Sequence, residues 1–400
     1  MDGAQPANEY TKHFENQVIL LTGATGSLGG CLLYKLALRL PTKKIYALCR
    51  GSAAQAVRKW ESTMPQQIDN ILDSGKVELI TGDLSKPGLG LDPAIREKMR
   101  NEVTSIINTA ANISLVENLE KSIRDNCQTA VALFNMASEF HHVQHFVHFS
   151  SLAVNSFLPG GVVEERLYSS PGSVSEAEEL VGQPGADPSK LLLDERYAWP
   201  YGQAKHLAER LLLGRSSSIP VLIIRPSAIG PAIAEPFALY GPDKAIPMHT
   251  LLLCFSISDI GRVGTTDHVF EEVPVDLVAN CCLLHLAKKT TGVVHCASLL
   301  YVTQTAAEVM SAARECISHA EMAEVFRRQR SSTALLWQDK YKLEDIDQTP
   351  NWHIQCTKSE YQKTITGPLA LVPSQHDHKL HLQRRIRRMY QVFLVGESPS

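Results

Sequence analysis

Short apolar runs of strand length recur along the chain, and segments with helical periodicity separate them. Runs of Val, Ile and Leu without polar alternation are typical of strands that are buried on both faces. Strands that alternate with crossover helices predict an α/β fold with a doubly wound parallel sheet. The expected strands are residues 18–21, 44–49, 77–80, 105–108, 145–149, 221–224 and 293–296.

Apolar residues that return every three or four positions predict the helices between these strands. A basic amphipathic helix is expected near the C-terminus, with Leu382, Ile386, Met389 and Phe393 on one side. The other expected helices are residues 31–40, 53–72, 92–100, 123–140, 201–213, 273–287 and 303–330.

Residues 156–190 break this pattern, because Pro and Gly punctuate a run that is rich in glutamate. Such a composition indicates a surface insertion or lid rather than core. We therefore expect a flexible arm at 1–15, a nucleotide-binding domain at 16–240 that carries the insertion, and a smaller, mainly helical, substrate-binding part at 241–400.

The composition is that of an ordinary globular protein, with 44% hydrophobic and 20% charged residues. A formal net charge of −3 gives no sign of a nucleic-acid partner. The polar N-terminus, the lack of a long apolar run and nine scattered cysteines predict a cytoplasmic protein. The basic C-terminal helix leaves membrane association open, although a packed helix with a solvated basic face is the commoner arrangement.

Three glycines follow the first expected strand at intervals of three residues, and a helix comes after them. Glycine permits positive φ, close approach of the backbone to a pyrophosphate and close packing of helix on strand. The free N–H groups of the helix N-terminus then face the phosphates. The turn predicts a Rossmann-type dinucleotide site that includes Thr22, Gly23, Thr25, Gly26, Ser27, Leu28 and Gly29.

The residues that follow the next strands complete this expected site. Arg50 stands where an NAD-specific protein usually has an acidic residue, so a bidentate contact with a 2′-phosphate predicts NADPH over NADH. Asp83, next to Leu84, either accepts a hydrogen bond from adenine or caps a turn. The small Ala110 and Ala111 would let the nicotinamide half lie close to the backbone.

Tyr201 and Lys205 are four residues apart on one expected helix, and Ser151 follows the fifth strand. Hydride that reaches a carbonyl carbon leaves negative charge on the oxygen, and this charge needs a hydrogen-bond donor. Tyr201 is the candidate donor, and Ser151 would donate to the same oxygen. Lys205 would lower the pKa of Tyr201 and hold a ribose hydroxyl of the cofactor. The order and spacing of the three favour catalysis over three unrelated polar groups.

Clusters of histidine are the other candidate for chemistry. Residues 141, 142, 145 and 148 are all histidine, but the segment runs from a helix end into a strand and would not gather them around one ion. His376, His378 and His381 lie in a polar tail. We therefore predict no metal.

The chain resembles the extended short-chain dehydrogenase/reductases, and among them the fatty acyl-CoA reductase and thioester reductase branch, called the male-sterility type. The resemblance covers roughly residues 16 to 300. It rests on TGATGSLG at 22–29, KKIYALCR at 43–50, GDL at 82–84, DNCQTAVALFNMA at 125–137, FVHFSS at 146–151, YGQAK at 201–205, RPSAIGPAIAEP at 225–236 and VPVDLVAN at 273–280.

This resemblance implies that NADPH reduces an acyl thioester, carried by CoA or by an acyl carrier protein, to an aldehyde and a free thiol. Further reduction to an alcohol stays open. It also implies a structural or water-holding role for Asn126 behind the site, and contacts of Pro226 and Ser227 with the cofactor. Ser27, Gln128 and Ser151 depart from the usual family residues and loosen the substrate assignment. An extended-family reductase of a ketone, aldehyde or nucleotide sugar is the alternative enzyme, and an NADPH-binding scaffold is the alternative that is not an enzyme.

Overall fold

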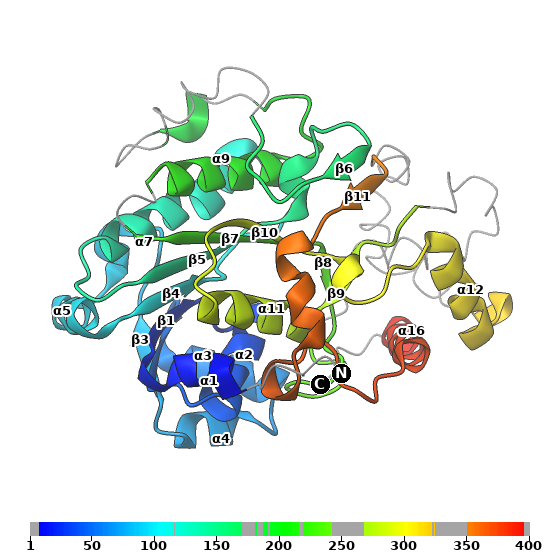
Figure 1. The fold of residues 1–400 in the computed structure, drawn as a ribbon, viewed down its shortest axis with the longest axis horizontal. Coiled ribbons are helices and arrows are strands. Elements are labelled where there is room, and N and C mark those ends of the chain that lie inside the picture. Colours follow the sequence, from blue (N-terminus) through cyan, green and yellow to red (C-terminus); the bar gives the residue numbers. More distant parts are fainter. Residues whose placement is uncertain are drawn as a thin grey trace.

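A seven-stranded parallel sheet forms the centre of the computed structural model (Figure 1), in the order β10-β7-β5-β4-β1-β2-β3. The structure describes residues 8–115, 117–169, 181, 187–190, 193–215, 219–241, 268–321, 324 and 350–395. The strands are β1 (Val18–Thr22), β2 (Lys44–Cys49), β3 (Val77–Thr81), β4 (Ser105–Asn108), β5 (His145–Phe149), β7 (Val221–Pro226) and β10 (Gly292–Cys296). Each lies within two residues of its expected position, so the predicted doubly wound sheet is confirmed.

The strand order reverses between β1 and β4. From β1 the chain builds outward through β2 and β3, and it then returns to β4 on the other side of β1. The carboxyl ends of β1 and β4 therefore face the crevice where doubly wound sheets bind their ligands. Both strands consist of buried residues throughout, which explains their unbroken apolar runs.

Two helical layers cover the sheet (Figure 1). One layer contains α2 (Ser27–Tyr34) with its π-helical continuation η2 (Lys35–Arg39), α3 (Ala53–Thr63), α4 (Ile68–Asp73) and α11 (Val275–Ala287). The other contains α5 (Pro93–Glu102), α6 (Leu119–Ile123), η4 (Arg124–Gln128), α7 (Thr129–Ala137) and α9 (Pro200–Gly214). Each layer packs its own hydrophobic cluster against one face of the sheet.

The structure differs from the prediction at the expected helix 53–72 and in the expected N-terminal arm. The expected helix at 53–72 is two helices, because Pro65 cannot continue α3 after Met64. The expected arm is folded from residue 8, since α1 (Asn8–Lys12) and η1 (His13–Asn16) carry the fully buried Phe14 to the core. The first seven residues of that arm lie outside the described part of the chain.

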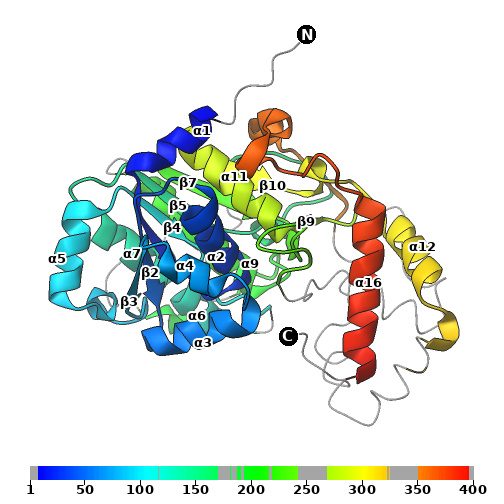
Figure 2. The same cartoon turned by 90° about the horizontal axis from the view of Figure 1, so that it is seen from below.

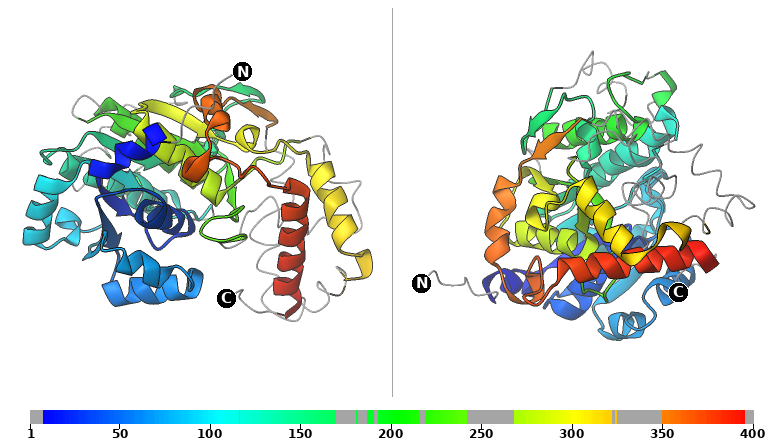
Figure 3. Two further views of the ribbon diagram at one scale, coloured as in Figure 1. Left: turned by 60° about the horizontal axis from the view of Figure 1, so that its bottom comes forward. Right: turned by 90° about the vertical axis from the view of Figure 1, so that its right-hand side faces the viewer.

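Elements beyond the predicted boundary at residue 240 complete the central sheet. The last strand of the central sheet is β10, and α11 packs beside α2, so both belong to the nucleotide-binding domain. What remains of the C-terminal part is centred on α12 (Ala306–Cys316) and α16 (His378–Val395), which lie side by side (Figures 2 and 3). As predicted for α16, Leu382, Ile386 and Met389 are buried in this contact.

The first part of the expected lid is attached to a distant part of the chain. Strand β6 (Gly161–Val163) pairs with β11 (Trp352–Ile354), which lies far along the chain. The Glu165 carboxylate is 7% exposed and accepts hydrogen bonds from His295 N at 2.9 Å, Thr357 Oγ1 at 3.0 Å and Lys358 N at 2.7 Å. Residues 161–165 thus lie at the surface, with Val162 and Glu164 exposed, but Val163 and Glu165 are buried and attach the segment to the rest of the fold. Residues 170–180 and 182–186 lie outside the described residues.

Two smaller features complete the fold. Strand β8 (Ala228–Gly230) extends the chain beyond β7 and pairs with β9 (Glu272–Pro274), which leads directly into α11. Among the described residues, we find no helix with both the length and the apolar character needed to cross a membrane.

Candidate active site

Close packing explains the glycines of the turn after β1. Gly23 has φ of +68°, and a Cβ there would lie 2.6 Å from Thr109 Oγ1. A Cβ at Gly29 would lie 2.1 Å from the Gly23 carbonyl oxygen. The turn therefore lies tightly between the β4 loop and helix α2. Gly26 provides the N-cap of α2 without a side-chain hydrogen bond, so the first N–H groups of the helix are available to an anion.

A buried hydrogen-bonded chain joins the carboxyl ends of β1, β4 and β5. Thr22 Oγ1 donates to Asn108 Oδ1 at 2.6 Å, and Asn108 Nδ2 donates to His148 Nδ1 at 3.0 Å. His148 Nδ1 must accept this bond, so its proton lies on Nε2. Burial, followed by the charge of Lys205, holds the pKa of His148 well below its ordinary value. Sequence reasoning missed Asn108 and His148, although each is a polar residue at the end of an apolar strand.

Ser151 and Tyr201 meet beside the end of β5, as the motif spacing predicted. Ser151 caps the short helix η5 (Leu152–Asn155), and Tyr201 lies in the first turn of α9. A Cβ at Gly202 would lie 2.6 Å from the Ala153 carbonyl oxygen, so glycine lets the two helices approach. Tyr201 is 8% exposed, and the Ser151 side chain lies close enough to its hydroxyl to influence its pKa.

Lys205 lies one turn after Tyr201 and is 1% exposed, with Nζ donating to the Phe149 carbonyl at 2.9 Å. Burial lowers the pKa of Lys205 to about 8, and the carboxylate of Glu209 opposes the shift. Burial raises the pKa of Tyr201 to about 12, and the Ser151 side chain opposes that shift. Lys205 is not among the groups that shift Tyr201, so its expected lowering of the Tyr201 pKa is not found.

Behind this helix, Glu209 and Arg225 form an ion pair that is completely buried. Arg225 Nε lies 2.9 Å from Glu209 Oε1, and its second terminal nitrogen reaches Oε2 at 2.5 Å. Arg225 belongs to β7, so the pair ties α9 to the sheet. The positions of Tyr201 and Lys205 on α9 depend on this attachment.

Residues after β2 and β3 lie on the adenosine side of the expected site. Arg50 follows β2 and is exposed, so its guanidinium is accessible to a phosphate. Asp83 accepts hydrogen bonds from the Ser85 hydroxyl at 2.7 Å and the Ser85 N–H at 3.0 Å, and these bonds lower its pKa. Of the two roles left open for Asp83, the structure shows the turn cap. Leu84 is half-buried against the core.

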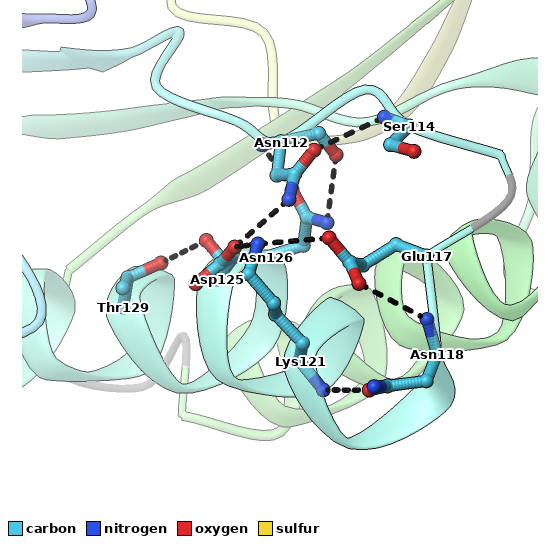
Figure 4. Close-up of polar contacts among 8 residues, drawn as sticks. All are labelled: Asn112, Ser114, Glu117, Asn118, Lys121, Asp125, Asn126 and Thr129. Carbon is cyan, nitrogen blue, oxygen red and sulfur yellow. Dashed lines mark hydrogen bonds and ion pairs between the residues drawn. The ribbon is translucent and has the colours of Figure 1, made fainter.

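Asn126 holds the loop that follows β4 (Figure 4). Its Oδ1 accepts from Asn112 N at 3.0 Å, and its Nδ2 donates to the Asn112 carbonyl at 2.9 Å. The Asn112 side chain in turn donates to Asp125 Oδ2 at 2.9 Å. Ala110 and Ala111 precede Asn112 in this loop. Asn126 therefore fixes the backbone of the loop that carries Ala110 and Ala111.

Pro226 ends β7, and Ser227 continues to β8. Ser227 N donates to the Cys296 carbonyl at 2.9 Å, while its buried hydroxyl has no hydrogen-bond partner among the described residues. Buried polar atoms are nearly always satisfied, so an orphaned hydroxyl at a sheet edge fits a polar group of a bound ligand. This observation agrees with a dinucleotide that lies over the end of the sheet.

The comparisons agree with this geometry. A family model described as "Male sterility protein" matches residues 21–282. Probable fatty acyl-CoA reductase 5 of Arabidopsis thaliana is 27% identical over 331 residues, with 69% of this chain and 64% of the relative covered. Fatty acyl-CoA reductase 1 of Gallus gallus is 28% identical, with 68% and 55% covered. The chain therefore spans only part of the length of these relatives.

Solved structures show the same fold. The terminal R domain of the myxalamid PKS-NRPS pathway has a TM-score of 0.63 at 20% identity, covering 94% of this chain and 90% of that domain. The reductase domain of a nonribosomal peptide synthetase from Mycobacterium tuberculosis has a TM-score of 0.61 at 16% identity, covering 98% and 96%. At these identities the likeness shows a shared Rossmann-type architecture.

Proposed function

The chain belongs to the male sterility protein family, and from that premise we propose that it reduces an acyl thioester with NADPH to an aldehyde and a free thiol. The observation that supports the proposal is the neighbouring pair of Ser151 and Tyr201 beside the carboxyl ends of the strands that flank the glycine turn. Relatives named fatty acyl-CoA reductases support the thioester as substrate.

One group of residues would bind the cofactor, and another would act on the substrate carbonyl. NADPH, when bound, supplies the hydride that reduces the thioester carbonyl carbon. The turn Gly23–Gly29 and the N-terminus of α2 would hold the pyrophosphate, and Ser227 would contact the nicotinamide half. Arg50, exposed after β2, supports a preference for the 2′-phosphate of NADPH.

Tyr201 and Ser151 would both donate hydrogen bonds to the carbonyl oxygen as negative charge develops there. A phenol with a pKa near 12 stays protonated at neutral pH, so Tyr201 is a donor throughout the reaction. The resulting hemithioacetal then collapses: the C–S bond breaks, the aldehyde carbonyl re-forms and the sulfur leaves as a thiol after it takes up a proton. Lys205, one helical turn away, would hold the ribose beside this pair.

We propose acyl-CoA and acyl carrier protein thioesters as the substrate classes and the cytoplasm as the compartment. Eight described cysteines are free, and seven of them are buried, which supports a reducing compartment.

The test is incubation of the purified protein with NADPH and a panel of acyl-CoAs and acyl-pantetheine carriers, following NADPH absorbance and thiol release together. We expect equal amounts of NADPH oxidised and thiol released when the reaction stops at the aldehyde. Oxidation of NADPH by ketones, aldehydes or nucleotide sugars without thiol release would favour the alternative enzyme class. Binding of NADPH without turnover on the whole panel would favour a scaffold.

A further inference from the structure

The carboxylate of Asp276 fixes a loop that the proposed chemistry does not use. Asp276 is the second residue of α11 and is 5% exposed. Its Oδ1 accepts a hydrogen bond from Ile233 N at 3.0 Å, and its Oδ2 accepts from Ala234 N at 2.9 Å and Glu235 N at 3.1 Å. Hydrogen bonds to a carboxylate are charge-assisted and strong, so one side chain orients three consecutive peptide groups. We call residues 231–241 the strap.

The strap is closed on itself and lies along the helix that begins at the glycine turn. Its ends are joined by hydrogen bonds from Ala232 N to the Tyr240 carbonyl at 2.9 Å and from Leu239 N to the Ala232 carbonyl at 2.8 Å. A Cβ at Gly30 of α2 would lie 2.3 Å from the Tyr240 hydroxyl. A side chain at position 30 would therefore displace the Tyr240 hydroxyl of the strap.

Charge also attaches the strap to this helix. The Glu235 carboxylate pairs with Lys35, whose side chain is buried, and with Arg39, whose Nε lies 2.7 Å from Oε1. Both basic residues belong to η2, the continuation of α2. Asp276 holds the strap to α11, and the ion pairs of Glu235 hold it to η2. The strap therefore lies between α11 and the α2–η2 helix.

The strap ends beside the expected pyrophosphate. Gly241 has φ of +96°, and a Cβ there would lie 3.6 Å from Ser27 Cβ and 3.8 Å from Ser27 Oγ. Ser27 is the first residue of α2 and follows the glycine that caps it. The last residue of the strap thus lies against the turn whose N–H groups are available to the phosphates.

We propose that the strap is part of the dinucleotide site and that Asp276 is the residue that positions it. Through the strap, Asp276 would fix the position of α2 and hold the backbone at Gly241 next to the pyrophosphate. The inference rests on the proposed function in one respect, namely that the cofactor is NADPH. Among the described residues, no hydrogen bond or ion pair joins Ser151 or Tyr201 to the strap or to Asp276, so we expect the effect on cofactor affinity and not on the chemical step.

The test compares Asp276→Asn with Glu165→Gln, because each removes the charge of a buried carboxylate that accepts three hydrogen bonds. Glu165 lies at the β6–β11 side of the molecule and serves as the matched control. We expect Asp276→Asn to raise the Kd for NADPH about tenfold or more, and Glu165→Gln to change it less than about twofold. At saturating NADPH, kcat of Asp276→Asn should stay within about threefold of wild type.

Hydrogen exchange on the wild-type protein gives a second measurement that needs no variant. Addition of NADPH should slow exchange of the amides at 233–235. A folded Asp276→Asn variant with wild-type Kd, equal losses in both variants, or exchange at 233–235 that NADPH leaves unchanged would each overturn the inference. Wild-type protein that binds NADPH without reducing thioesters would contradict the proposed function only, since the Kd comparison would still decide the role of the strap.

Discussion

Burial moves the pKa values of Tyr201 and Lys205 in opposite directions, and the shift of Tyr201 suits its proposed role as a donor. The phenol becomes a weaker acid and remains a donor, while the ammonium becomes easier to deprotonate. The sequence predicted the meeting of Ser151 and Tyr201 because helix periodicity and strand order place them at one sheet edge. It could not predict the partners of Asn108 or Asp276, because those bonds join segments whose relative placement only the folded chain determines.

Removal of the Tyr201 hydroxyl should abolish turnover. Tyr201→Phe loses the proton donor to the carbonyl oxygen, so we expect kcat to fall about 10²-fold to 10⁴-fold while the Kd for NADPH stays nearly unchanged. Single-turnover kinetics and NADPH titration measure the two quantities. A variant with wild-type kcat would remove Tyr201 from the mechanism.

Arg50 should decide between the two nicotinamide cofactors. Arg50→Glu replaces a group that can pair with a 2′-phosphate by one that repels it, so NADPH affinity should fall much more than NADH affinity. Ratios of kcat/KM for the two cofactors would report this, with Arg58→Glu on the exposed side of α3 as a control for general charge. Equal losses for both cofactors would contradict a 2′-phosphate contact.

Lys205 should make the free energy of unfolding depend on pH in the alkaline range. Its folded pKa of about 8 lies below the ordinary 10.5, so the unfolded chain binds more protons between these values and wild-type stability rises with pH there. Lys205→Met should therefore be more stable than wild type by as much as about 3 kcal/mol below pH 8. This advantage should shrink as pH rises toward 10.5. Urea unfolding at pH 7 and pH 10 tests this, and a difference that does not change between them would argue against the shift.

At the scale of elements, the long strands were predictable and the short ones were not. All the sheet strands except the edge strand β3 are almost entirely buried, and they leave apolar runs that can be recognised without knowledge of their neighbours. Strands β6, β8, β9 and β11 have three residues each, which is too short for a periodic pattern. The pairing of β6 with β11 also depends on the buried carboxylate of Glu165, whose partners lie in other parts of the chain.

The neighbouring glutamates at 164 and 165 provide a test of this pairing. Glu165→Ala leaves the buried His295 and Lys358 N–H groups without an acceptor, so we expect a loss of about 3 kcal/mol in the free energy of unfolding. Glu164→Ala removes an exposed ion pair with Arg166 and should cost less than about 1 kcal/mol. Chemical denaturation measures both, and similar losses would show that the position of Glu165 is not special.

At the scale of the whole molecule, a buried ion pair attaches the C-terminal helix to the sheet domain. Arg385 of α16 makes two contacts with Glu272 of β9, one of them at 2.8 Å, and both side chains are buried. A further arginine, Arg388, donates to the Leu239 carbonyl of the strap. The basic helix thus uses two of its arginines internally, while Arg384 and Arg387 remain exposed.

Removing one partner of this ion pair should destabilise the protein more than replacing both partners with apolar residues. Arg385→Met removes the cation that pairs with the buried Glu272 carboxylate, so we expect the free energy of unfolding to fall by about 3 to 5 kcal/mol. The double variant Arg385→Met with Glu272→Leu removes both charges and should recover most of that loss. Urea unfolding of the two single variants and the double variant gives a double-mutant cycle. A double variant as unstable as Arg385→Met would contradict the expected recovery.

The pairing of β6 with β11 has a consequence for the order in which the protein forms in the cell. During synthesis, β6 leaves the ribosome long before β11. The Glu165 carboxylate cannot accept its hydrogen bonds from Thr357 and Lys358 until those residues have been made. The edge of the early-made domain therefore stays incomplete, with an exposed strand, until translation has passed residue 358. A stalled or cleaved chain that ends before β11 would expose this edge, and chaperones would be expected to bind the unfinished protein there.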